Sequence, residues 1–250
     1  MSLAPSLNKK AFLLFHLNLS FSSIESDDHT KLIKNCYWPL LNLVSSTGFK
    51  TGIEISGSSL EKIAELDPLW VKEFSRLHSK GLLELIGSGA YQVIGPLIPY
   101  EVNLSNQLLG LKIYKKILGV IPTCVLINEM AFSSGVVDFY IEAGFETVLM
   151  ERNNAALALN NKSLRDVDKI KFLQGTAENK IKVLWTDSIM FQRLQRYIHN
   201  DISLSTYYKD LNDYHLKFTD TLPIYSNDAE VFNFRPGRFS QEAKIEHDEW

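Results

Sequence analysis

Residues 11–18 have the sequence AFLLFHLN, in which five apolar residues in succession precede a histidine. A continuous apolar run of this length is typical of a strand that is buried on both faces of a parallel sheet. Similar short runs recur along the chain, separated by segments with apolar residues at helical spacing. We expect seven buried strands, which are Ala11–Phe15, Thr51–Ile55, Leu82–Ile86, Thr123–Ile127, Thr147–Met150, Lys182–Trp185 and Leu222–Tyr225.

Most segments between these strands have the apolar spacing of helices. A first helical pattern runs from Leu32 to Val44, and Pro39 should kink it or start a second helix. The other predicted helices are Leu60–Leu66, Leu69–Leu77, a segment that ends at Gly119, Gly135–Ala143 and Leu204–Phe218. The stretch Asn153–Asn179 is polar and irregular, and we expect a long loop with little helix there. Alternating strands and helices predict a parallel sheet in an α/β fold. Because no linker rich in Pro, Gly or Ser divides the chain, we expect residues 1–250 to form one closed or nearly closed barrel domain.

The composition excludes several classes of partner. The formal net charge of -3 argues against a nucleic-acid backbone or an anionic membrane as the main partner. No apolar run approaches the roughly 20 residues of a membrane-spanning helix. Cys36 and Cys124 each lie in an apolar run, so we expect free thiols, which favour a reducing compartment and a cytoplasmic location.

Polar residues follow the predicted strands at the end where α/β barrels carry their active sites. The residues at or near these ends are His16, Asn18, Glu54, Glu84, Asn128, Glu129, Glu151, Arg152, Trp185, Thr186, Asp187, Asn227, Asp228 and Glu230. One such acid is usually solvated or caps a helix. A ring of acids that converge on one opening is different, because they repel one another unless some are protonated or paired.

Carboxylates in two unlike environments are what glycoside hydrolysis requires, because one must be ionised and the other must hold a proton. Other chemistries have weaker support. The sequence lacks a Gly-x-x-x-x-Gly-Lys loop, a dinucleotide-binding glycine motif and a Gly-x-Ser-x-Gly motif. The two nearest histidines, His16 and His29, are 13 positions apart, so no helical pair of metal ligands exists. We therefore expect neither a metal nor another cofactor.

Four segments together resemble glycoside hydrolase family 57, in the family's order and spacing along nearly the whole chain. These segments are Phe15–Asn18, Glu84–Ser88, Ile127–Ala131 and Asn227–Glu230. The resemblance implies an incomplete (β/α)7 barrel, similar to a TIM barrel, with mostly parallel strands. It also implies a retaining enzyme that acts on the α-glycosidic bonds of an oligo- or polysaccharide, since the family includes amylases, 4-α-glucanotransferases, branching enzymes and α-galactosidases.

The resemblance also assigns roles to residues. Glu129 corresponds to the family's nucleophile and Asp228 to its general acid/base. His16 matches the first histidine of a family motif, and Glu84 matches the acid of another. Asn18 stands where the family usually has a second histidine of the inner sugar subsite; asparagine can hydrogen-bond a sugar hydroxyl but carries no charge.

Further residues are predicted to bind substrate because they lie near the same strand ends. They are Glu54, Trp185, Asp187, Glu230 and Arg235. The family usually continues into a helical C-terminal region, and we expect that region to be absent or truncated here.

Two other functions remain as alternatives. A metal hydrolase similar to polysaccharide deacetylases would need an Asp/His metal triad, and the histidine spacing argues against one. A non-catalytic carbohydrate-binding barrel is suggested by Asn18, although the presence of both Glu129 and Asp228 argues for an enzyme.

Overall fold

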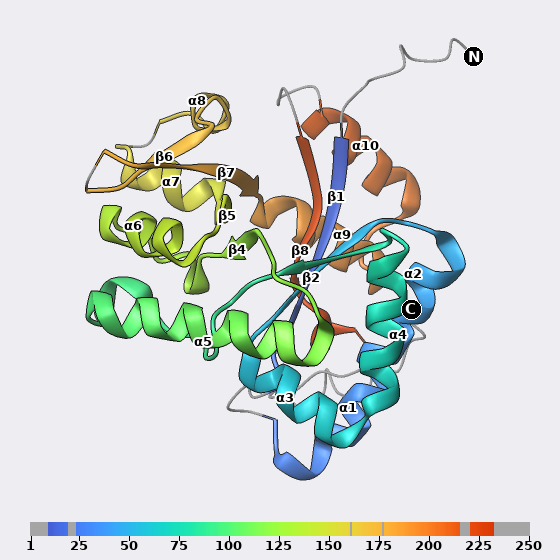
Figure 1. Ribbon diagram of the computed structural model, residues 1–250. Helices are drawn as coiled ribbons and strands as arrows, with labels where there is room; N and C mark the ends of the chain where they lie inside the picture. Colours follow the sequence, from blue (N-terminus) through green and yellow to red (C-terminus); the bar gives the residue numbers. More distant parts are fainter. Residues whose placement is uncertain (1–9, 20–23, 161, 177, 216–220, 233–250) are drawn as a thin grey trace.

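The computed structural model describes residues 10–19, 24–160, 162–176, 178–215 and 221–232, and Figure 1 shows their arrangement. The strands are β1 (Lys10–Leu17), β2 (Thr51–Ile55), β3 (Leu83–Ile86), β4 (Cys124–Leu126), β5 (Thr147–Glu151), β6 (Phe172–Gln174), β7 (Lys180–Thr186) and β8 (Thr221–Asp228). All seven predicted strands are confirmed. Strand β6 is an additional one, which runs antiparallel to β7.

The strands form two sheets, with the orders β3-β2-β1-β8 and β4-β5-β7-β6. Gly87, directly after β3, joins the sheets through a parallel pairing with Val125. Its N–H donates to the Cys124 carbonyl at 2.8 Å, and its own carbonyl accepts from the Leu126 N–H at 2.9 Å. Seven parallel strands thus run in one series from β8 to β7. No pairing closes that series between β7 and β8 within the described strands, which agrees with the predicted incomplete barrel.

Helices cover the outside of the strands. The first half of the chain supplies α1 (His29–Leu32), the π-helical turn η2 (Ile33–Tyr37), α2 (Trp38–Thr47), α3 (Gly57–Leu66), α4 (Pro68–Ser79) and α5 (Tyr100–Leu118). The second half supplies α6 (Ser134–Ala143), α7 (Arg152–Ala158), α8 (Leu164–Asp168), α9 (Ser188–Ile198) and α10 (Leu204–His215). Residues 216–218 of the last predicted helix lie outside the described part of the chain.

Local sequence signals explain several helix ends. Asp67 accepts hydrogen bonds from the backbone N–H groups of Leu69 and Trp70 at the start of α4. Gly119 ends α5 with φ 71°, a left-handed conformation that favours glycine. In the core, a small apolar cluster lies between the strands, and larger clusters pack the helices against the sheets.

The prediction of a long loop over residues 153–179 was wrong, because this segment contains most of α7, all of α8 and strand β6. The physical reason lies in long-range contacts. The fully buried Arg152 guanidinium binds Asp168 at 2.8 Å and the Tyr214 hydroxyl at 2.6 Å. These contacts hold two short polar helices that have little apolar patterning of their own.

Two predictions from composition can also be compared with the structure. Cys36 and Cys124 are free thiols, as expected. None of the helices in the described ranges combines the length and apolar character that crossing a bilayer requires.

Candidate functional site

Polar side chains meet where β2, β1 and β8 end. The strand register places His16 beside Glu54 of β2 and beside Asp228 of β8, so that three polar residues stand level on adjacent strands. The His16 Nδ1 atom and the Glu54 Oε2 atom are 2.9 Å apart. Both side chains are buried, although parallel strands of a barrel are otherwise lined by apolar residues. Two residues predicted from strand ends, His16 and Glu54, are thus brought together with Asp228.

The chain after β1 contacts the last residue of β8 and the 3-10 turn η5 (Ala229–Val231) that follows it. The Asn18 side-chain amide donates to Asp228 Oδ1 at 2.6 Å, and the Asn18 backbone N–H donates to Glu230 Oε1 at 2.8 Å. The Tyr37 hydroxyl of η2 also donates to Glu230 Oε1. The Cys36 thiol donates to the Ala229 carbonyl at 2.9 Å. The π-helical turn therefore fixes the segment that carries both acids, and such turns are frequent at functional sites.

Sequence reasoning did not identify Tyr37 or Gln92 as site residues. Tyr37 lies in a helical apolar pattern that gives no indication of a polar contact. Gln92 lies in the loop after β3, where its Nε2 donates to Asn18 Oδ1 at 2.6 Å. No motif in the sequence could have found Gln92, because the contact joins residues that are far apart in the chain.

Glu129 follows β4 in the short 3-10 turn η4 (Asn128–Met130) and is exposed. Glu129 has φ 52° and Met130 has φ 51°, and consecutive left-handed residues other than glycine are unusual. The buried Asn128 anchors this turn, since its Oδ1 accepts from the Ser88 hydroxyl at 2.9 Å and its Nδ2 donates to the Ser88 carbonyl at 3.2 Å. The strained backbone is therefore held from both β3 and β4.

The surroundings of the acids in this site shift their pKa values. Burial raises the pKa of Asp228, and the charges of Glu54 and Glu129 raise it further, against the opposing effects of His16 and the Asn18 hydrogen bond. Burial likewise raises the pKa of Glu230, to about 7. Burial lowers the pKa of His16, but the Glu54 hydrogen bond and the surrounding acids outweigh it, so that the pKa is raised overall. The site therefore retains protons that exposed acids would lose.

Glu54 Oε1 and Glu230 Oε2 are buried and lack a hydrogen-bond partner within the described residues. Such atoms are uncommon in folded proteins and call for an explanation such as water or a functional role. No group of three His, Cys, Asp or Glu side chains within the described ranges is placed to hold a metal ion. Chemically, an exposed carboxylate and a buried carboxyl group with a raised pKa suit a reaction that needs a nucleophile and a proton donor.

Other predicted site residues are not brought into this cluster. Asp187 is buried, accepts from the Ile189 and Met190 N–H groups at the start of α9, and lies 3.6 Å from the Arg152 guanidinium. Trp185 donates to the Ile170 carbonyl at 2.8 Å and lines an apolar cavity of about 360 Å³ that also includes Met130.

Glu84 lies two residues before Ile86, which is the residue that stands level with Glu54. It is exposed and borders a cavity of about 460 Å³ together with Lys50, Gly52 and Gly81, which precede or begin their strands. The structure thus separates Glu84 from the acids at the carboxyl ends. Arg235 lies outside the described residues.

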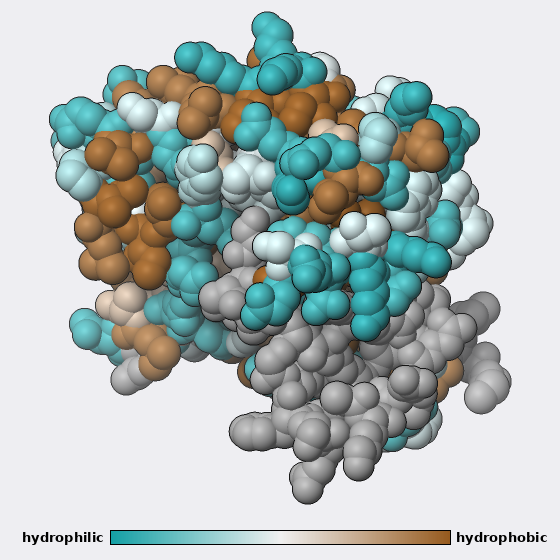
Figure 2. Space-filling view, turned by 90° about the horizontal axis from the view of Figure 1, so that it is seen from below, coloured by the Kyte–Doolittle hydropathy of each residue, from teal (hydrophilic) through white to brown (hydrophobic). Residues whose placement is uncertain are grey.

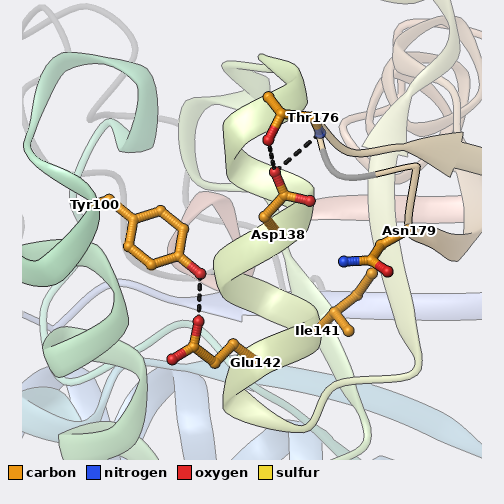
Figure 3. A pocket seen from close by; sticks show the side chains of 6 residues that line it. All are labelled: Tyr100, Asp138, Ile141, Glu142, Thr176 and Asn179. Carbon is orange, nitrogen blue, oxygen red and sulfur yellow. Dashed lines mark hydrogen bonds between the residues drawn. The ribbon is translucent and has the colours of Figure 1, made fainter.

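A further cavity of about 440 Å³ lies on the side of α6, as Figure 3 shows. Asp138 and Glu142 project from that helix. Glu142 accepts from the Tyr100 hydroxyl at 2.5 Å, and Asp138 accepts from the Thr176 N–H at 2.9 Å. None of the predicted site residues lines this cavity.

Figure 2 views the molecule from the side toward which β1 and β8 run in Figure 1. Apolar patches gather on the left of this view, the side on which α5 and α6 lie. Exposed apolar residues of α5 include Val102, Leu108 and Leu109. Much of the centre is hydrophilic where described residues are visible, in keeping with a polar site at this end of the strands.

Comparison with known proteins gives consistent results. The family model described as glycosyl hydrolase family 57 matches residues 7–236. An alpha-amylase from Pyrococcus furiosus is 24% identical over 119 residues, which are 47% of this chain and 18% of that protein. The chain therefore spans about a fifth of this curated relative.

Solved structures share the fold. The 4-alpha-glucanotransferase from Thermococcus litoralis has a TM-score of 0.74 and 20% identity, covering 92% of this chain and 35% of that one. The family 57 branching enzyme from Pyrococcus horikoshii has a TM-score of 0.63 and 12% identity, covering 90% and 64%. The incomplete barrel, the acids at its strand ends and a family model that covers most of the sequence lead to one conclusion: the chain belongs to glycosyl hydrolase family 57.

Proposed function

We propose that this protein cleaves or transfers α-glycosidic bonds of an oligo- or polysaccharide with retention of configuration. Glu129 is the nucleophile and Asp228 is the general acid/base. One observation supports this division most directly: Asp228 is partly buried with a raised pKa, whereas Glu129 is exposed and close enough for its charge to contribute to that shift. The Asp228 carboxyl group therefore keeps its proton to higher pH than an exposed aspartate does, as a general acid must.

In the first step, the Glu129 carboxylate attacks the anomeric carbon while protonated Asp228 gives its proton to the departing glycosidic oxygen. The glycosyl group is then bound covalently to Glu129, and Asp228 is ionised. In the second step, Asp228 accepts the proton of a water or sugar hydroxyl as that oxygen attacks the same carbon. Glu129 is released as a carboxylate, and two inversions give net retention.

His16 and Glu54 complete the electrostatics of this site. The hydrogen bond to Glu54 keeps the His16 ring in place, and the raised pKa of His16 extends its positive charge to higher pH. That charge favours the ionised form of Asp228, which appears after the first step. Asn18 is half-buried and can contact a sugar hydroxyl, whereas the buried Glu54 and Glu230 act on the site through His16, Asn18 and Tyr37.

The substrate class is supported by the names of the similar proteins, which are an alpha-amylase, a 4-alpha-glucanotransferase and a branching enzyme. We infer an α-glucan on that basis. We also infer a cytoplasmic location, because both cysteines are free thiols.

A screen with aryl α-glycosides and maltooligosaccharides, followed by product analysis, tests the proposed function. We expect turnover of an α-glucoside with retained configuration, and we expect activity to survive exhaustive chelation. Loss of activity on chelation that zinc or manganese restores would support the deacetylase-like alternative. Sugar binding with no turnover of any substrate would support the non-catalytic alternative.

Replacing Asp228 and replacing Glu129 should change the reaction in different ways. In an Asp228→Ala variant, aryl glycosides with good leaving groups should react faster than natural oligosaccharides, and azide should restore turnover with retained configuration. In a Glu129→Ala variant, azide should fill the vacated space and give the inverted product. Exchanged behaviour of the two variants would reverse the assignment.

A further inference from the structure

The Asn18 side-chain amide lies between an acid and a second amide. Its Nδ2 donates to Asp228 Oδ1 at 2.6 Å, and its Oδ1 accepts from Gln92 Nε2 at 2.6 Å. Both contacts are short for hydrogen bonds that involve nitrogen donors. Asn18 is half-buried and Gln92 is exposed, so the series runs from the surface to the acid.

The chemistry of the groups explains the orientation of this amide. An ionised carboxylate can only accept hydrogen bonds, so the NH₂ group of Asn18 must face Asp228 while that acid is ionised. The Asn18 carbonyl oxygen then faces away and needs a donor. Gln92 supplies that donor with its own NH₂ group. Without it, the Asn18 amide could turn by half a rotation about its last bond and present its oxygen to Asp228.

The loop that carries Gln92 is well anchored. The preceding residue, Tyr91, is bonded twice to the Asn106 side chain of α5, with its N–H donating at 2.9 Å and its carbonyl accepting at 2.9 Å. The Ala90 N–H also donates to the Asn106 carbonyl at 2.9 Å. The contact with Asn18 therefore starts from a fixed backbone, although the Gln92 side chain itself is exposed.

We propose that Gln92 is a positioning residue that holds the Asn18 amide with its N–H groups toward Asp228. This inference rests on the proposed role of Asp228 as general acid/base. Through Asn18, Gln92 favours the ionised form of Asp228 and so sets the upper pH at which that residue still supplies a proton. Gln92 needs no contact with the substrate for this effect.

Other groups around Asp228 also influence its protonation, and the test must keep them unchanged. They are His16 of β1, Tyr37 of η2, Glu54 of β2, Glu129 after β4, Tyr225 of β8 and Glu230 of η5. None of them is altered when Gln92 alone is replaced. A change in the behaviour of Asp228 in Gln92 variants can therefore be attributed to Asn18 or to a new charge at position 92.

The test compares Gln92→Glu, Gln92→Lys and Gln92→Met by the pH profile of kcat/KM with an aryl α-glucoside. An ionised glutamate can only accept, so it turns the NH₂ group of Asn18 outward and its oxygen toward Asp228. This favours protonated Asp228, and the alkaline limb should move up by about one pH unit. Lysine can only donate, so it keeps the Asn18 oxygen facing position 92, and the alkaline limb should move slightly to lower pH. Methionine should give a smaller upward shift than glutamate.

The same three substitutions in an Asn18→Ala background separate orientation from charge. The backbone N–H of residue 18 still reaches Glu230 there. Shifts below about a third of those in the wild-type background support the inference, because a screened surface charge alone has little effect. Equal shifts in both backgrounds, or unchanged profiles, would overturn it.

A second readout distinguishes this inference from the proposed function. Carbon-13 NMR titration of the Asp228 carboxyl group measures its pKa without any turnover. If the wild type is inactive on every α-glycoside while the NMR pKa still shifts with Gln92→Glu, the proposed function fails and the positioning role stands. If the enzyme is active and the NMR pKa is unchanged, only the positioning role fails.

Discussion

Two groups of acids lie near the carboxyl ends of different strands. The mouth cluster contains His16, Glu54, Asp228 and Glu230, at the ends of β1, β2 and β8. The Arg152 cluster contains Arg152 and Asp187, which directly follow β5 and β7, together with Asp168 of α8 and Tyr214 of α10. From the sequence alone, both groups are predicted to belong to the active site, since each contains acids at or near strand ends.

Their electrostatics differ. In the Arg152 cluster, one guanidinium binds two carboxylates, and Asp187 also accepts from the first N–H groups of α9. In the mouth cluster, a histidine contacts one of three acids, and the pKa values of Asp228 and Glu230 are raised by burial. A fully paired group of acids holds elements together, whereas an incompletely paired group keeps protons that chemistry can use.

The largest expected effect concerns Glu129, whose charge raises the pKa of Asp228 in the mouth cluster. Glu129→Gln should lower kcat/KM by roughly 10⁴-fold or more, because an amide cannot form the glycosyl ester. Glu151→Gln is the control, since Glu151 is also an acid at the carboxyl end of a strand, β5, but accepts from the N–H groups of Asn153 and Ser188. It should keep activity within about tenfold. Equal losses in both variants would remove the distinction between nucleophile and structural acid.

Breaking the Arg152 cluster should affect stability instead. Arg152→Met leaves Asp168 and Asp187 buried without their guanidinium, which costs about 3–5 kcal/mol of unfolding free energy. Denaturant unfolding measures this loss, and kcat/KM of the folded fraction should stay near the wild-type value. Asp228→Asn is the comparison in the mouth cluster, where stability should change little and activity should fall. A stable Arg152→Met variant would contradict the structural role of this cluster.

A smaller effect concerns pH. Because the pKa of folded Glu230 is about 7, above its usual 4.5, the folded state binds more protons than the unfolded state between these values. Glu230 therefore makes stability fall as pH rises from 4.5 to 7. Glu230→Gln should remove this part of the decline, a difference of about 3 kcal/mol in the unfolding free energy across that range. Parallel stability curves for the two proteins would show that Glu230 is not perturbed.

The barrel was predictable because its strands are buried on two faces, and such strands appear in the sequence as short, nearly continuous apolar runs. The strand-end argument also found His16 and Glu54, but it found Asp187 with equal ease. Sequence does not reveal that Asp187 turns back to α9 and Arg152. Short polar helices such as α7 and α8 were missed because a distant buried ion pair, and not local patterning, stabilises them.

Tyr37 and Gln92 show a second reason why some site residues cannot be predicted from sequence. Tyr37 enters the site because the π-helical turn η2 brings its hydroxyl to Glu230, and Gln92 enters because α5 anchors its loop. Each contact depends on how separate elements pack together. The acids and Asn18 are visible in sequence near strand ends, whereas Tyr37 and Gln92, the neutral groups that contact Glu230 and Asn18, are visible only in the fold.

The central claim is that Glu129 forms the covalent intermediate, while Asp228 donates a proton to the leaving oxygen and later accepts one from the attacking water or sugar. The most direct test uses the Asp228→Ala variant with an α-glucoside that has a good leaving group, because loss of the general base slows the second step. Mass spectrometry should then show one added glucosyl unit on the peptide that contains Glu129, released by azide. A label on another carboxylate, or turnover without any trapped adduct and with inverted product, would contradict the account.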